Sequence, residues 1–298
     1  MYHFIVNLKA GRGYTRRIVH KLERFLNEHK LPYTFYDTFY PGNAIEIAHR
    51  LSEIEGIDRV IAVGGDGTFN EVLNGVNPDK TVIGFIPAGS GNDFARAAGF
   101  SLNPVEALQD VVNDKIIEAD YMEIGAENNF RRCVNIAGTG LDIEVLTRYN
   151  RARFVKNKLQ YYWCLLRALV RLKTYKVKMT LSGATTEHDC FVVAVCNGQY
   201  FGGGMRVSPN SDIYDGQMDV VIIHMIKRSR IPGVLLKFFK GRHIGLDFVE
   251  VHKTDYVELE CETSKIVNID GELLNLPFKA RLVKGGLKMY APSSKAYL

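Results

Sequence analysis

The run VIAVGGDGTFNE at residues 60–71 constrains the fold more than any other part of the chain. Its β-branched and apolar residues predict a buried strand, and three glycines then leave the end of that strand almost without side chains. One carboxylate and one hydroxyl, those of Asp66 and Thr68, remain there. Such an end is either an ordinary tight turn or a place where a large anion comes to rest.

Strand and helix patterns alternate over the first 120 or so residues. Apolar runs predict strands in YHFIVN, PYTFYDT, DRVIAV and TVIGFIP. Helical spacing joins the apolar residues of two intervening segments, which are Ile18, Leu22, Phe25 and Leu26, and Ala44, Ile47, Ala48 and Leu51. This alternation is typical of a parallel α/β sheet, whose ligand sites lie at the carboxyl ends of the strands.

The pattern changes after about Asp120. Short β-type runs separated by turn residues follow, which is typical of an all-β sandwich or barrel. We therefore predict an α/β N-terminal domain with a parallel sheet, over residues 1–124, followed by an all-β sandwich C-terminal domain over 125–287. The last residues, 288–298, could rejoin the first domain.

Three glycine-bearing junctions occur in the α/β half, at Asn7–Gly13, Gly64–Asn70 and Ala88–Asp93. A strand-to-helix glycine turn uncovers backbone N–H groups and can hold a phosphate. Any one of them alone is more often a plain turn, but three at one edge of a sheet favour an anion site. The dinucleotide pattern G-x-G-x-x-G fails because residue 16 is Arg, and the P-loop pattern is absent.

Two of these junctions carry a recognisable pair of motifs. GGDGTFNEVLNG followed by IPAGSGNDFAR resembles the diacylglycerol kinase catalytic domain in its bacterial soluble lipid kinase form. GGDGT alone also occurs in NAD kinases and phosphofructokinases, whereas GSGNDFAR is much more specific. The downstream order EADY, YDGQMDV, NIDGELL agrees with the same family over essentially the whole chain. One departure is Leu8, where the family's first loop usually has proline.

The resemblance implies an ATP site and a catalytic magnesium ion. The residues that it assigns to ATP are Asn7, Lys9, Gly11, Thr38, Gly64, Gly65, Asp66, Gly67, Thr68, Phe69, Asn70 and Ser90. Backbone amides and hydroxyls suit a triphosphate, and phosphoryl transfer depends on Mg²⁺ and positioning. We expect the carboxylates of Asp66, Asp93 and Asp120 around that ion. The alternative for Asp93 is a helix N-cap before FARA.

The resemblance also assigns a catalytic base and a second metal site. The base that accepts the hydroxyl proton is expected at Glu272, with Asp270 two residues away; the alternative is that Asp-Gly simply forms a hairpin turn. Asp212, Asp215 and Gln217 match a second, structural Mg²⁺ site. An Asp-rich turn without an ion is the alternative for these three.

The charge is unevenly distributed, with a net +5 overall. Residues 145–186 contain ten Lys or Arg and residues 220–246 contain six, without an acid in either, so the remainder carries −11. Such segregation suggests one basic surface facing an anionic partner.

A helix is expected within the first basic segment, at about 148–173, and another at about 229–241. In the first, apolar residues fall at helical spacing, with Arg167 and Arg171 toward the other side; they are Leu159, Tyr162, Trp163, Leu166, Leu169 and Val170. A basic helix with Trp and Tyr suits an anionic membrane surface. The alternative is that its apolar face packs on the β domain. We find no nucleic-acid recognition motif.

Together these features predict an ATP- and Mg²⁺-dependent lipid kinase that phosphorylates a lipid hydroxyl, with diacylglycerol as the first choice of acceptor. The alternatives are a kinase for a soluble substrate such as NAD and a non-catalytic nucleotide-binding regulator. The sequence shows no secretory signal and no stretch of about 20 apolar residues, and its five cysteines form no CxxC pair. A cytoplasmic protein that associates peripherally with the membrane is expected, with a homodimer as an option.

Overall fold

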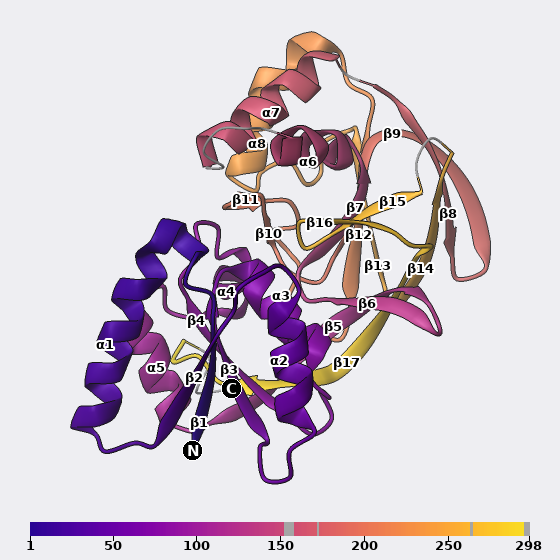
Figure 1. The fold of residues 1–298 in the computed structure, drawn as a ribbon. Coiled ribbons are helices and arrows are strands. Elements are labelled where there is room, and N and C mark those ends of the chain that lie inside the picture. Colours follow the sequence, from indigo (N-terminus) through magenta and orange to yellow (C-terminus); the bar gives the residue numbers. More distant parts are fainter. Residues whose placement is uncertain (152–157, 172, 263–264, 295–298) are drawn as a thin grey trace. The chain divides into compact units, whose positions relative to one another are not determined.

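The chain forms two compact units in the computed structural model, which describes residues 1–151, 158–171, 173–262 and 265–294 (Figure 1). The first unit consists of Met1–Asp120 with Gly285–Leu298, and the second of Tyr121–Lys284. Two strands, β5 (Ile116–Ala126) and β17 (Phe278–Tyr290), run from one unit into the other. Of the segment 288–298 that was expected to rejoin the first domain, residues 295–298 lie outside the described part.

The first unit contains a parallel sheet in the order β2–β1–β3–β4–β17. Its other strands are β1 (Tyr2–Val6), β2 (Tyr33–Asp37), β3 (Arg59–Gly64) and β4 (Val82–Pro87). Its helices are η1 (Ala10–Gly13), α1 (Tyr14–Glu28), α2 (Asn43–Ser52), α3 (Asp66–Gly75), α4 (Asp93–Ala98) and α5 (Pro104–Val112). Helix α3 begins at Asp66, so the carboxylate belongs to its first turn.

Apolar spacing explains how this sheet is covered. Ile18, Leu22 and Leu26 of α1 are buried with Phe4 and Val63 of the sheet in one cluster. Helices α1 and α5 pack together in that cluster, and α2 packs beside α3 (Figure 1). The carboxyl ends of the strands, where the glycine junctions lie, are left to the loops.

The second unit is built from antiparallel strands and helices. Its strands are β6 (Asn129–Cys133), β7 (Ile136–Gly140), β8 (Tyr175–Leu181), β9 (Ala184–Cys196), β10 (Tyr200–Phe201), β11 (Met205–Arg206), β12 (Met218–His224), β13 (Val249–Thr254), β14 (Tyr256–Cys261), β15 (Ile266–Ile269) and β16 (Glu272–Asn275). Its helical elements are α6 (Leu141–Arg151), α7 (Lys158–Arg171), η2 (Arg228–Arg230) and α8 (Ile231–Phe239). The predicted order, an α/β domain with a parallel sheet followed by a β domain, is confirmed.

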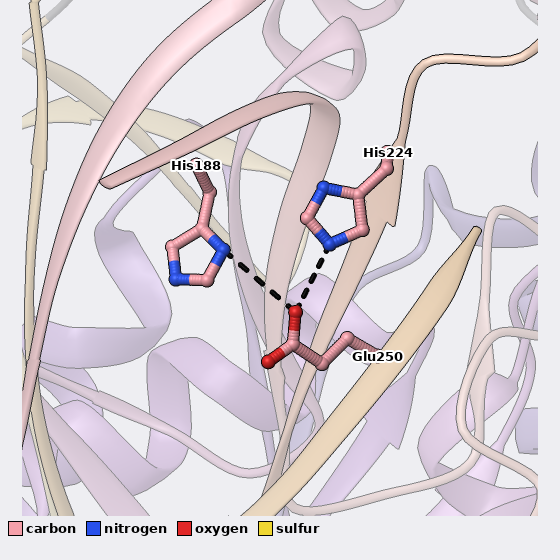
Figure 2. Close-up of side chains that lie close together, drawn as sticks. All are labelled: His188, His224 and Glu250. Carbon is pink, nitrogen blue, oxygen red and sulfur yellow. Dashed lines mark hydrogen bonds and ion pairs between the residues drawn. The ribbon is translucent and has the colours of Figure 1, made fainter. Parts of the chain in front are cut away.

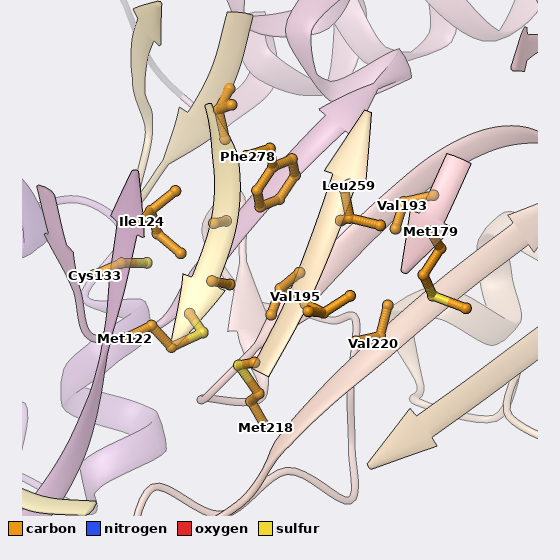
Figure 3. Packing of buried hydrophobic residues seen from close by; sticks show 14 of the residues in the cluster. Met122, Ile124, Cys133, Met179, Val193, Val195, Met218, Val220, Leu259 and Phe278 are labelled. Carbon is orange, nitrogen blue, oxygen red and sulfur yellow. The ribbon is translucent and has the colours of Figure 1, made fainter. Parts of the chain in front are cut away.

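Strand β9 organises the second unit because it pairs with three others. Its first part pairs with β8, and its last residues pair with β7 on one side and β12 on the other. The main core of the unit is packed from the inward side chains of these strands and their neighbours, including Met122, Val195, Val220 and Phe278 (Figure 3).

A second layer of apolar side chains joins the helices to the same strands. Phe191 and Ile223 are buried there with side chains of α7 and α8 packed against them. The helix expected at about 148–173 is in fact α6 followed by α7, and residues 152–157 lie outside the described part. Helices α6, α7 and α8 therefore cover one face of β7, β9 and β12.

Candidate active site

The three glycine junctions of the first unit meet at the carboxyl ends of β1, β3 and β4. A β-carbon on Gly11 would lie 2.4 Å from the carbonyl oxygen of Ala88, and one on Gly89 would lie 2.4 Å from the Cα atom of Gly65. Backbone therefore packs on backbone, and any side chain at Gly11 or Gly89 would push the loops apart. The junctions predicted separately from sequence lie together at one edge of the sheet.

Polar side chains hold these loops together. Asn7 Nδ2 donates to Thr68 Oγ1 at 3.2 Å, and Asn7 Oδ1 accepts from the backbone N–H of Lys9 at 3.1 Å. The Lys9 ammonium donates to the carbonyl of Phe39 at 3.1 Å, and Thr38 N–H donates to the carbonyl at the end of β1. Asn7, Lys9, Thr38 and Thr68 are thus brought to one edge of the sheet.

Phe69 differs from the other residues that the resemblance assigned to ATP. Its side chain is fully buried and packs against Phe94 and Phe85, with ring centroids 4.5 Å and 4.9 Å apart. Its backbone N–H donates to the carbonyl of Gly65. Phe69 therefore supports the loop from within the core, whereas Ser90 and Gly67 are exposed.

Asp66 connects the second and third junctions. Its Oδ1 accepts from the N–H of Phe94 at 3.0 Å, in the first turn of α4. Burial raises the pKa of the Asp66 carboxyl, and the N–H groups of Asp93, Phe94 and Asn92 oppose that rise. A buried carboxylate whose pKa remains raised favours a cation beside it, and carboxylate oxygen is a ligand that Mg²⁺ prefers. The residues present fit the expected magnesium ion.

The other two carboxylates are placed differently. Asp93 is the first residue of α4, beside Asn92, whose φ of +53° turns the chain into the helix. Asp120 lies in β5, and its Oδ1 accepts from the N–H of Gly285 at 2.7 Å. The fold thus connects Asp66 with the loop that carries Asp93, and the place of Asp120 around the same ion stays a prediction.

Sequence reasoning missed Glu71, which fixes the loop after β2. Its two carboxylate oxygens accept from the N–H groups of Gly42 and Ala44, at 3.0 Å and 3.1 Å. These are orphan donors at the start of α2, and a carboxylate there is stabilised by the helix dipole. A glutamate inside the GGDGTFNE run gives no local sign of this role, because its partners lie 27 and 29 residues earlier.

Asp270 and Glu272 belong to the second unit and do different things. The Asp270 carboxylate accepts from three successive N–H groups, those of Val134, Asn135 and Ile136, at 2.9 to 3.2 Å. The Glu272 carboxylate is partly exposed and accepts from Arg131 Nη2 at 3.1 Å. Asp270 therefore orders the chain before β7, whereas the Glu272 side chain is 38% exposed.

The turn that was expected to hold a second magnesium ion is closed by its own hydrogen bonds. Asp215 accepts from Gln217 N–H through Oδ1 at 3.0 Å and from Lys253 Nζ through Oδ2 at 2.8 Å. That hydrogen bond raises the pKa of Lys253. Asp212 Oδ1 accepts from the N–H of Tyr214 at 3.3 Å. The Lys253 ammonium supplies positive charge at Asp215, and the second ion stays a prediction.

The second unit contains an apolar pocket. It has a cavity volume of about 140 Å³ and is lined by side chains of α6, α7, α8 and neighbouring strands. The polar side chains among its lining residues are those of Asp142, Asn268 and Tyr161. Asp142 Oδ2 accepts from Asn268 Nδ2 at 3.1 Å, whereas its buried Oδ1 has no hydrogen-bond partner among the described residues. Burial raises the pKa of Asp142 to about 6. One carboxylate thus lies in otherwise apolar walls.

Helix α7 presents an apolar stripe to solvent. Leu159, Trp163, Leu166 and Val170 are 78, 54, 46 and 73% exposed, although they recur at helical spacing. The opposite side of the helix, with Cys164 and Ala168, is buried. Arg167 does not point to the other side as expected; its guanidinium carbon lies 5.2 Å from the Trp163 ring centroid. In the described part of the chain, no helix is long and apolar enough to cross a membrane.

Comparison with known proteins agrees with this division. Residues 1–124 match the diacylglycerol kinase catalytic domain, and residues 135–291 match the YegS C-terminal NAD kinase beta sandwich-like domain. The chain therefore belongs to the family of diacylglycerol kinases and YegS-like lipid kinases.

Individual relatives cover most of the chain. A diacylglycerol kinase of Mycobacterium tuberculosis is 30% identical over 259 residues, which are 84% of this chain and 83% of that protein. A diacylglycerol kinase of Bacillus subtilis is 27% identical over 272 residues, 90% of this chain and 88% of that protein. A solved diacylglycerol kinase structure from Bacillus anthracis shares the fold, with a TM-score of 0.73, 24% identity and coverage of 99% and 97%.

Proposed function

We propose that the chain is an ATP-dependent lipid kinase that transfers the γ-phosphoryl group to the hydroxyl of diacylglycerol and so forms phosphatidic acid. The observation that carries the choice of a lipid is the apolar pocket of the second unit. Its walls offer aliphatic and aromatic side chains to an acyl chain, and Asp142 offers a carboxylate oxygen to a polar group of the lipid. Such a pocket suits a long apolar ligand with one polar end.

The glycine loops are proposed to bind the triphosphate of ATP. Their glycine backbone, the hydroxyls of Thr68 and Ser90, and the start of α3 are suited to negative charge. Mg²⁺, when bound, neutralises charge on the phosphates. Asp66, Asp93 and Asp120 are the residues that we propose to hold it. Asp66 has in addition the task of fixing the loop that carries Asp93.

Glu272 is the proposed general base. In the transfer, the lipid hydroxyl oxygen forms a bond to the γ-phosphorus, the bond from that phosphorus to the β,γ-bridging oxygen breaks, and the hydroxyl proton passes to the Glu272 carboxylate. Its contact with Arg131 orients the carboxylate for that task. Asp270 is assigned a positioning role, because its oxygens already accept three backbone N–H groups.

Peripheral binding to an anionic membrane is proposed for the face formed by α7 and α8. The two helices pack on each other, with the rings of Tyr162 and Phe239 5.3 Å apart. Leu236 of α8 is exposed like the stripe of α7, and the basic residues of both segments surround these side chains in sequence. An interfacial helix inserts apolar side chains into the membrane and places basic side chains against anionic headgroups.

The apolar pocket also argues against the alternative of a soluble acceptor such as NAD. A dinucleotide carries phosphates and many hydroxyls, and burying them against apolar walls would cost free energy. The other alternative is a nucleotide-binding regulator without catalytic activity. The proposed base Glu272, held beside Arg131, argues against it.

ADP release from the full chain tests the proposal. Purified protein is given ATP and Mg²⁺ with vesicles that contain diacylglycerol, a sphingoid base or phosphatidylglycerol, or with NAD in solution. We expect ADP to appear with the diacylglycerol vesicles. If ADP forms only with another lipid, that lipid is the acceptor in place of diacylglycerol. If ADP forms only with NAD, the substrate is soluble and the lipid kinase proposal is wrong. ATP binding without ADP formation would favour the non-catalytic regulator.

A further inference from the structure

Three neighbouring strands of the second unit bring two histidines and a glutamate together (Figure 2). Glu250 Oε2 lies 3.0 Å from His224 Nε2 and 3.7 Å from His188 Nδ1. The three ligand atoms all lie within 4.8 Å of one another. Around a tetrahedral zinc ion with bonds of about 2.0–2.1 Å, ligand atoms stand about 3.3 Å apart. The spacing is therefore close to that of a metal site without large rearrangement.

Strand register explains why these residues share one face. Glu250 pairs with Ile222 in β12, and His224 is two residues further along that strand, so both project to the same side. His224 pairs with Cys190 of β9 because the register shifts between Ile223 and His224, as in a β-bulge. This shift turns His224 to the side of Cys190 and hence of His188, two residues earlier. A regular ladder would have separated the two rings.

The remaining nitrogen of each ring has its own partner. His188 Nε2 lies 2.7 Å from Thr186 Oγ1, and this hydroxyl donates to the carbonyl of Met179 at 3.5 Å. The hydroxyl therefore accepts from Nε2–H, which leaves the lone pair of His188 on Nδ1, the atom that faces Glu250. His224 Nδ1 lies 3.4 Å from the carbonyl of Asp189, an acceptor, so Nε2 is the ligating nitrogen there. Outer contacts of this kind orient metal-binding histidines.

His252 holds the glutamate from the other side. Its Nε2 lies 2.6 Å from Glu250 Oε1, the oxygen that does not face the two rings. His188 is largely buried, with 10% of its side chain exposed, whereas 32% of the His224 side chain and 38% of the Glu250 side chain are exposed, so solvent reaches the cluster from their side. The cluster thus has an inner set of three ligands, three outer contacts and an open side.

We propose that His188 Nδ1, His224 Nε2 and Glu250 Oε2 bind a divalent transition-metal ion of the zinc type, with water in the fourth position. Imidazole nitrogen favours zinc and its neighbours over Mg²⁺, so this site is chemically separate from the magnesium of the kinase reaction. Strand β13 pairs only with β12 among the described strands. An ion shared by His188, His224 and Glu250 fastens β13 to β9 across β12 and stabilises the second unit.

Metal binding to the full chain tests the site. Metal-free protein without a polyhistidine tag is titrated with Zn²⁺ by calorimetry and with Co²⁺ by visible absorption, in excess Mg²⁺. We expect one ion per chain, a tetrahedral Co²⁺ spectrum without a thiolate band, and a rise of about 5 °C in unfolding temperature with saturating Zn²⁺. His224→Gln and His188→Gln should each weaken Zn²⁺ binding about 100-fold or more and remove the rise.

Two matched variants make the result specific. His252→Gln removes an outer contact and should weaken binding only about tenfold, because outer contacts orient ligands without bonding the ion. His20→Gln removes an exposed histidine whose Nδ1 lies 3.3 Å from Glu23 Oε2, and it should change nothing. Circular dichroism establishes that each variant is folded. The proposal is overturned if folded His224→Gln and His188→Gln bind Zn²⁺ as the wild type does, if the wild type binds none, or if a thiolate band appears.

Discussion

A β-carbon on Gly89 would lie 2.4 Å from the Cα atom of Gly65. The second and third glycine junctions therefore touch backbone against backbone here, and the Phe94 N–H to Asp66 hydrogen bond joins them as well, so the loop that carries Asp66 cannot move independently of the loop that carries Ser90. The glycines therefore differ in whether they tolerate a side chain. A β-carbon on Gly89 would clash with backbone, whereas one on Gly67 would meet nothing within 4 Å. The difference between Gly89 and Gly67 can be measured.

Gly89→Ala should separate the two loops. We expect it to lower the free energy of unfolding by about 1–3 kcal/mol, as overpacked sites do, and to weaken ATP binding about tenfold or more. Chemical denaturation and calorimetric titration with ATP measure the two effects. Gly67→Ala is the control, because it adds a methyl group to open space in a helix and should not lower stability. If Gly89→Ala, Gly67→Ala and the wild type all have the same free energy of unfolding, the close packing of Gly89 on Gly65 does not stabilise the fold.

Glu272→Gln and Asp270→Asn should separate chemistry from structure. Glu272→Gln removes a proposed base that is partly exposed, so we expect normal stability and a loss of turnover of about 10²–10⁴-fold. Asp270→Asn places an amide where three backbone N–H groups donate, so a lowering of the free energy of unfolding by about 1–3 kcal/mol is expected. Denaturation and steady-state kinetics of both variants check this. If Glu272→Gln turns over like the wild type, the base is assigned wrongly.

Asp142 makes stability depend on pH. Its pKa is about 6 in the folded chain and near 3.8 when unfolded, so between these values the folded chain keeps a proton that the unfolded chain has released. The free energy of unfolding therefore falls as pH rises through this window, and above it the cost of the buried charge is about 3 kcal/mol. Asp142→Asn should remove the cost, being about 1–3 kcal/mol more stable at about pH 7.5 but not at about pH 4.

The same variant should lose activity if Asp142 contacts the lipid. Asn keeps an oxygen for the amide of Asn268 and loses the charge, so we expect turnover of lipid about tenfold lower, while ATP binding is unchanged. A gain in stability coupled to a loss of lipid turnover is typical of a functional site. Denaturation across pH and kinetics with vesicles measure both. A variant with full lipid turnover would remove Asp142 from the substrate site.

The apolar stripe of α7 should bind vesicles. Trp163→Ala with Val170→Ser should reduce binding to anionic vesicles about tenfold without lowering the free energy of unfolding, because both side chains are largely exposed. Flotation with vesicles of anionic lipid, at low and high salt, measures it, and binding should fall with salt. Phe39→Ser is the control, since Phe39 is also exposed but lies in the first unit. Similar losses in both variants would exclude a specific role for α7.

The features that could be predicted from the sequence are those set by residues close together in the chain. The strands of the first unit and the glycine junctions are local patterns, and the common edge of a parallel sheet follows from them. Helix α3 begins at Asp66, directly after a glycine pair, because the contact of Asp66 with α4 fixes its first turn. Local propensity is weaker than such tertiary contacts.

Other features depend on long-range register and were beyond the sequence. The three N–H groups that hold Asp270 lie more than 130 residues earlier, and His188, His224 and Glu250 come from three strands joined by a register shift. The face of α7 was also ambiguous, because apolar residues occur on both sides of that helix. Which side meets the β-strands is decided by packing in three dimensions, so Trp163 was found exposed only in the structure.

Transfer of labelled γ-phosphate tests the central claim most directly. The full chain is incubated with γ-labelled ATP, Mg²⁺, vesicles containing diacylglycerol, and NAD in the same reaction, beside an Asp66→Ala variant. We predict label in phosphatidic acid with the wild type and none with the variant. Label in NADP, or a lipid fraction without label while ATP is bound, would contradict the assignment of this chain as a kinase for diacylglycerol.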